Sequence, residues 1–137
     1  MSRPRLRPAA ALAALAVAAL VAAGCMTSAD AITGRAWKLV EIGGAAPAVE
    51  AGLGLEVDGR YSVRPGCNSG GGTYTINGNR ITFGVAAITA MACGEPADGQ
   101  EQAFLGVLGS TPAFEVETQT GRLRLKGAAG DLVFVAP

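Results

Sequence analysis

The sequence predicts an α+β domain made mostly of strands, in the form of a small antiparallel β-barrel or a strongly curled sheet with one helix. From Trp37 onward, runs of alternating apolar and polar residues recur, and Asp-Gly and Asn-Gly turn signals separate some of them. One segment near residue 100 has the apolar spacing of an amphipathic helix. Several short strands with one helix are typical of a barrel whose open end or side the helix fills.

The first strand is predicted in WKLVEI, residues 37–42, because its side chains alternate between two faces. Trp37, Leu39 and Glu41 then share one face, which Trp37 and Leu39 place in a core. Residues 43–52 are rich in Ala, Gly and Pro, so we expect a loop there.

A first hairpin is predicted in LGLEVDGRYSV, residues 53–63. A three-residue turn, Asp58-Gly59-Arg60, pairs Val57 with Tyr61 and Leu55 with Val63 and puts every apolar residue on one face. A two-residue turn would mix apolar and polar residues, so we prefer the longer one.

A second hairpin is predicted in GTYTINGNRITF, residues 72–83. A two-residue Asn77-Gly78 turn pairs Tyr74 with Ile81 and Ile76 with Asn79. The four apolar side chains on the shared face are then Tyr74, Ile76, Ile81 and Phe83.

One helix is predicted over residues 99–108, followed by three strands. Asp98 and Glu101 have capping-box spacing, and an apolar stripe follows at Phe104, Val107 and Leu108. After a Gly/Ser/Thr/Pro break, a meander is predicted in FEVET, in RLRLK with Leu123 and Leu125 facing inward, and in DLVFV.

The N-terminal segment has the pattern of a lipoprotein signal peptide. A basic start precedes residues 9–23, an apolar run of 15 Ala, Leu and Val residues that is shorter than the roughly 20 residues of a membrane-spanning helix. The sequence VAAGC, ending at Cys25, resembles the lipobox of bacterial lipoproteins, whose cysteine receives a diacylglycerol and becomes the first residue. Ordinary signal cleavage near Cys25 is the alternative.

We therefore expect a signal peptide at 1–24, a lipidated tether at 25–33 and a folded domain at 34–137. The acyl chains would hold the domain to a membrane of the cell envelope without embedding it. Met26, in place of an aspartate, resembles the sorting pattern for the outer membrane, where the domain would face the periplasm if the cell has two membranes.

Composition limits the classes of function. After Cys25 the chain carries 8 basic and 11 acidic residues, a formal net charge of −3 that does not fit a nucleic-acid-binding protein. Histidine is absent from the sequence, and no serine or cysteine has an obvious activating partner. We therefore expect no catalysis, no cofactor and no nucleic-acid partner.

Two charged runs near the C-terminus are expected to be solvated strand faces. Glu115 and Glu117 could pose as the paired carboxylates of a hydrolase, but alternation puts them opposite Phe114 and Val116. The basic run, Arg122, Arg124 and Lys126, lacks the interleaved aromatics of an anion or nucleic-acid site.

Cys67 and Cys93 remain once Cys25 is lipidated. An even pair in an exported domain indicates a disulfide, and buried free thiols are the alternative. A metal site is less favoured than a disulfide, because neither histidine nor a CxxC motif accompanies these cysteines.

Two stretches resemble the META domain of heat-inducible bacterial lipoproteins of the HslJ type: GCNSGGGTYTINGNRITFG at 66–84 and ITAMACGEPADGQEQAFLGVL at 88–108. The resemblance runs in order from Trp37 to the C-terminus, implies a β-barrel-like α+β domain and brings no established reaction. The positions that match the family motif are Gly66, Cys67, Asn68, Gly72, Thr89, Met91 and Cys93.

The sequence departs from the family motif at two places. The family usually has Arg-Phe where this chain has Ser69-Gly70, and Arg where this chain has Ala90. If those residues form a binding surface, it is missing here; if they brace the fold, other residues compensate.

The segment PGCNSGGG, residues 65–72, lacks the lysine and the following helix of a phosphate-binding loop. We predict a flexible turn beside the disulfide. Asn68 is expected to close an Asx-turn on its own backbone, a structural role preferred over ligand contact.

These features predict a non-enzymatic, monomeric envelope lipoprotein. Its domain would support envelope integrity or stress resistance by contacting another envelope protein or a small apolar ligand. The alternative is an inhibitor or binding module for an envelope hydrolase, using residues 43–52 or 65–72. A hydrolase that works with acidic residues alone would need two carboxylates converging in a cleft.

Overall fold

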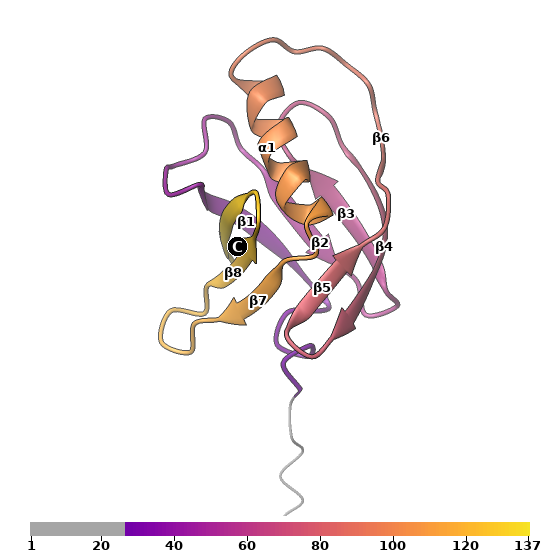
Figure 1. Ribbon diagram of the computed structural model, residues 1–137, viewed down its shortest axis with the longest axis vertical. Coiled ribbons are helices and arrows are strands. Elements are labelled where there is room, and N and C mark those ends of the chain that lie inside the picture. Colours follow the sequence, from indigo (N-terminus) through magenta and orange to yellow (C-terminus); the bar gives the residue numbers. More distant parts are fainter. Residues whose placement is uncertain (1–26) are drawn as a thin grey trace, which may run out of the picture.

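The computed structural model describes residues 27–137, which form nine strands and one helix (Figure 1). The expected signal peptide, Cys25 and Met26 lie outside the described residues. The elements are β1 Arg35–Ile42, β2 Gly52–Leu55, β3 Arg60–Arg64, β4 Gly70–Asn77, β5 Arg80–Phe83, β6 Ala87–Ile88, α1 Ala97–Gly109, β7 Ala113–Val116, β8 Leu123–Gly127 and β9 Gly130–Val135.

The strands form a closed antiparallel barrel, as the sequence predicted. Hydrogen-bonded neighbours run in the order β3, β2, β1, β9, β8, β7, β5 and β4, and pairing of β3 with β4 closes the ring. The short β6 adds to the free side of β4. The weakest strand pairing in the ring is between β5 and β7, which share a single residue pair, Arg80 and Ala113.

A β-bulge interrupts the first strand and corrects its expected alternation. Trp37 and Leu39 are buried as predicted, but the register with β9 shifts between Leu39 and Glu41. Glu41 is therefore not on the core face, and Ile42 packs against the core instead. One extra residue in a strand reverses the facing of everything after it.

Both predicted hairpins form, but each register was wrong by two residues. Leu55, rather than Val57, pairs with Tyr61, so Val57 lies in the turn with 82% of its surface exposed. In the second hairpin Ile76, rather than Tyr74, pairs with Ile81. A two-residue shift keeps each side chain on its face, because the side-chain period of a strand is two.

The helix fills the barrel with its apolar stripe. It begins at Ala97, two residues earlier than predicted, and lies against β5, β8 and β9 (Figure 1). Phe104 is fully buried, and its ring meets the ring of Phe134 edge-on at a centroid distance of 5.9 Å. Val107 and Leu108 are buried beside it, as the stripe predicted.

The described part of the expected tether, residues 27–33, packs onto the barrel instead of hanging free. Ile32 is completely buried, and its carbonyl accepts the indole N–H of Trp37 at 2.9 Å. Thr27 and Asp30 bond each other through backbone and side chain. A buried indole N–H needs an acceptor, so this segment completes the core around Trp37.

Because Phe104 fills the barrel, Phe104→Ala should lower the free energy of unfolding by about 3–5 kcal/mol, measured by urea denaturation. Leu105→Ala, at a half-buried position of the same helix, is the control and should cost clearly less. Equal losses in the two variants would contradict a core centred on Phe104.

Candidate functional site

A disulfide joins the two loops at the end of the barrel where α1 begins. Cys67, after β3, and Cys93, before α1, are bonded with 5.9 Å between their Cα atoms, which confirms the predicted pair. Asp98 places a carboxylate oxygen within 4.8 Å of both sulfurs. Its two oxygens accept the backbone N–H groups of Cys93 and Gly94, so Asp98 braces the loop that carries the disulfide.

Asn68 is the polar centre of this region. Its backbone N–H and its amide group both donate to the carboxylate of Glu101, at 2.7 and 2.8 Å. The amide also donates to the carbonyl of Met91, and the amide oxygen accepts from the Met91 N–H and the Thr89 hydroxyl. The expected Asx-turn is therefore wrong: at 3% exposure, the side chain bonds residues far away in sequence.

The predicted capping box of Asp98 and Glu101 does not form, and both carboxylates bond groups outside the helix. The N-cap residue is Pro96, which makes no side-chain cap, and the Gly99 N–H of the first turn donates to the Glu95 carboxylate at 3.3 Å. Asp98 faces back to the loop before the helix, and Glu101 faces across to Asn68. Acidic groups near the start of a helix still interact favourably with its dipole.

Sequence reasoning missed Gln100, which is 7% exposed. Its amide oxygen accepts from the N–H groups of Ala48 and Val49, and its amide nitrogen donates to the carbonyls of Val49 and Pro65. The helix thereby holds the loop between β1 and β2. The spacing of Gln100 four residues before Phe104 could have placed it on the buried face.

The glycine run expected to be a flexible turn is part of the barrel wall. Gly70–Gly72 begin β4 and pair with β3, and Gly70–Gly71 also pair with β6. A Cβ at Gly66 would lie 2.7 Å from the carbonyl oxygen of Ala97, and one at Gly72 would lie 3.0 Å from the ring of Tyr61. These motif glycines allow the close approach of neighbouring segments.

The two departures from the family motif lie side by side. The Thr89 N–H donates to the carbonyl of Ser69 at 3.1 Å, and Ala90 follows in the exposed loop. A side chain at Gly70 would overlap the carbonyl oxygen of Ala87. This chain therefore presents one continuous surface of small residues where the motif usually carries two arginines and an aromatic.

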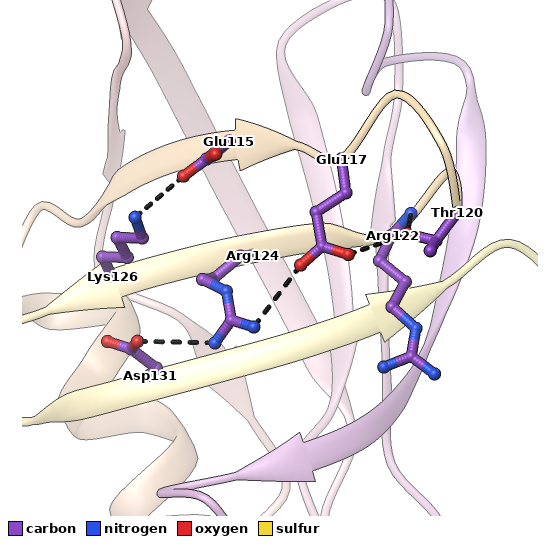
Figure 2. Close-up of polar contacts among 7 residues, drawn as sticks. All are labelled: Glu115, Glu117, Thr120, Arg122, Arg124, Lys126 and Asp131. Atoms are coloured by element: carbon purple, nitrogen blue, oxygen red, sulfur yellow. Dashed lines mark hydrogen bonds and ion pairs between the residues drawn. The ribbon is translucent and has the colours of Figure 1, made fainter.

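On the outer face of β7, β8 and β9, acidic and basic side chains form a network of ion pairs (Figure 2). Lys126 contacts Glu115 at 2.8 Å, and Arg124 lies between Glu117 at 3.4 Å and Asp131 at 3.7 Å. Each carboxylate thus faces a cation rather than another acid. Glu115 and Glu117 do not converge as the acid pair of a glycosidase requires.

The pKa of Glu117 also differs from what a general acid requires. A hydrogen bond from the Thr120 hydroxyl, together with Arg124, lowers the pKa of Glu117 below its usual range. A general acid needs a raised pKa, so this shift has the opposite sign. In Figure 2 the guanidinium of Arg122 points away from the three carboxylates.

A groove of about 540 Å³ crosses the outer face of β1, β2 and β3. Along its floor Ala36, Gly54 and Ser62 stand in register on adjacent strands. None of the three has a side chain large enough to fill the space. Ser69 and Gly70, two of the positions that depart from the family motif, also line the groove.

Two cations stand in the next row of the same face. Lys38 and Arg64 flank Gly52 in register, two strands apart, which is about 9–10 Å between strand axes. Within residues 27–137 neither forms an ion pair, unlike Arg124 and Lys126. The groove therefore carries two cations that form no ion pair among the described residues, and Glu50 and Pro137 also line it.

Comparison with known proteins identifies the family. The META domain matches residues 30–137. The chain belongs to the META domain family. The HslJ-type resemblance is consistent with this membership, and no curated protein matches the sequence.

Two solved structures share the META barrel. An NMR structure of a protein from Burkholderia xenovorans superposes with a TM-score of 0.61 at 25% identity, covering 77% of this chain and 83% of that one. A second NMR structure has a TM-score of 0.68 at 16% identity, covering 81% and 96%. Within residues 27–137, no helix has the length and apolar character needed to span a membrane.

Asn68→Asp should destabilise the META barrel by about 1–3 kcal/mol at neutral pH, because it removes two donated hydrogen bonds and sets a carboxylate beside Glu101. That repulsion raises the folded-state pKa of the new carboxyl group above its unfolded value. Stability should therefore be recovered at low pH and lost as pH rises through the raised pKa. Urea denaturation at several pH values measures this.

Asn79→Asp, at an exposed asparagine of the second hairpin, is the matched control. It should change stability little and show no added recovery in acid. An Asn68→Asp variant as stable as wild type at neutral pH would contradict the network.

Replacing both Cys67 and Cys93 by Ala should lower the unfolding free energy by about 3–4 kcal/mol, as expected for a 26-residue loop. Treating the wild-type protein with a dithiol reductant should give a similar loss in urea denaturation. The same reductant should not affect the double variant, and any effect there would point to another cause.

Proposed function

We propose that the mature chain is a non-enzymatic, lipid-anchored protein of the cell envelope. Its rigid META barrel supports envelope integrity under stress by binding another envelope component on its outer surface. The anchor is proposed from the lipobox-like sequence that ends at Cys25, and the disulfide fits an oxidising, extracytoplasmic compartment.

The observation that carries the binding role is the contrast between two faces of the barrel. On β7 to β9 the basic side chains Arg124 and Lys126 are engaged by acids. On β1 to β3 the cations Lys38 and Arg64 border an open groove and pair with nothing among residues 27–137. Unpaired charges beside a concave surface favour a partner of opposite charge.

The filled interior supports an external rather than an internal partner. Phe104 and Phe134 pack edge-on in the centre, and the side chains around them are almost completely buried. A small apolar ligand would normally bind inside a barrel, but the rings of Phe104 and Phe134 occupy the interior of this one. A carboxylate- or phosphate-bearing envelope component in the groove therefore fits better than the small apolar ligand.

The anchor is tested by intact mass spectrometry of the protein from membranes, with and without reduction and alkylation. A chain that begins at Cys25, carries acyl mass and gains two alkyl groups only after reduction supports the proposal. An unacylated chain removes the anchor and with it the proposed location.

The groove is tested by photo-crosslinking in intact cells, with a photoreactive amino acid at Ser62 on its floor. Replacing Lys38 and Arg64 together by Glu should reduce the crosslinked product at least tenfold, because the partner's anionic group would be repelled. Arg122→Glu with Lys126→Glu is the matched control, one arginine and one lysine on another face, and should leave the product unchanged.

The identity of the product separates the candidate roles. An envelope polymer or structural protein supports the proposed role. A single stoichiometric hydrolase would instead support the inhibitor role, and a product insensitive to Lys38 and Arg64 would contradict the groove.

A further inference from the structure

The described chain is fixed to one end of the barrel as far as Thr27. Ile32 is buried in the core and the Gly34 N–H donates to the Leu55 carbonyl, while bonds between Thr27 and Asp30 close a turn within the segment. Figure 1 shows this segment leaving the barrel at the end opposite the start of α1. The position where the chain leaves the domain is therefore defined by packing.

The proposed anchor, Cys25, precedes Thr27 by only two residues in the sequence. Two peptide units separate Cys25 from Thr27, which allows at most about 7 Å between their Cα atoms. A domain of this length has a radius of gyration of about 13 Å. A lipid on Cys25 therefore brings this end of the barrel to the membrane surface and keeps the opposite end away from it.

Three strand connections share this end with Thr27, because the pairs β2 and β3, β4 and β5, and β7 and β8 turn there: residues 56–59, 78–79 and 117–122. Thr27 lines a common depression with Asn79 and Val116. Val57 is at the tip of the first connection and is 82% exposed. An apolar side chain at the tip of a turn can enter the boundary between headgroups and acyl chains.

The charge distribution favours the same orientation. Four basic and four acidic residues lie at this end, so it is formally neutral: Arg35, Arg60, Arg80, Arg122, Asp30, Glu56, Asp58 and Glu117. The other described residues include four basic and seven acidic side chains, which carry the whole net charge of −3. An anionic bilayer repels that part of the domain and tolerates the neutral end.

We propose that the barrel end formed by residues 27–33, 56–59, 78–79 and 117–122 docks on the lipid headgroups, with Val57 at the headgroup boundary. The proposal rests on the lipid anchor at Cys25. In this orientation the disulfide, the Asn68 network and the start of α1 point away from the membrane, and the groove on β1 to β3 stays open at the side.

The test uses the full acylated protein in vesicles of equal parts phosphatidylcholine and phosphatidylglycerol, with bromine near the headgroup end of the acyl chains as a fluorescence quencher. Val57→Trp places a reporter at the proposed contact. Met91→Trp is the matched control, because Met91 is also an exposed apolar residue, at 60%, but lies beside Asn68 at the far end. The single natural tryptophan, Trp37, is buried and gives the background.

The tryptophan at position 57 should lose at least half of its emission in brominated vesicles, and the one at position 91 should stay within the wild-type background. Equal quenching at both positions, or none at position 57 in an acylated, vesicle-bound protein, would overturn the orientation and leave the anchor standing. Absence of acyl mass on the purified chain would overturn the anchor and the orientation together.

Discussion

The hydrogen bonds of Asn68 join three segments that strand pairing leaves separate. One carboxamide connects the loop after β3, the loop before α1 and, through Glu101, the helix itself. The disulfide between Cys67 and Cys93 fastens the same two loops covalently. A domain this small buries limited apolar surface, so holding the helix that fills its barrel matters for the whole fold. Gln100 adds a third attachment, to the loop between β1 and β2.

Several acidic side chains of the described domain are engaged by hydrogen bonds within the fold. Asp98, Glu101 and Glu117 each accept hydrogen bonds that hold them in the fold. For Glu117, the hydrogen bond from Thr120 and the nearby Arg124 lower the pKa of the carboxyl group and so favour its charged form. The groove beside Lys38 and Arg64 is different, because its cations face solvent without an acidic partner among the described residues. This contrast supports the proposed recognition of an anionic partner.

The anchor and the groove are compatible in one geometry. In the proposed orientation, a lipid on Cys25 would hold the end of the barrel where Thr27 lies rather than its side, so the wall formed by β1, β2 and β3 would stay accessible. The loops that carry the disulfide are then farthest from the lipid. The residues at Ser69, Gly70 and Ala90 belong to this accessible part of the surface, where the META motif usually has larger side chains. In this arrangement the residues that match the META motif are kept, while the surface at these three positions differs from the motif.

The sequence by itself determined the fold class, every strand except β6, the buried face of most of these strands, the helix stripe and the cysteine pair, because all of these follow from local periodicity and from composition. It also carried the family motif. Only the tertiary structure decided the hairpin registers, since a shift of two residues keeps the same side chains inside. The same holds for the bulge after Leu39 and for the partners of Asn68 and Gln100, which are distant in sequence and meet only when the barrel closes. A local sequence pattern indicates whether a side chain is buried or polar. Only the closed barrel determines which distant groups that side chain contacts.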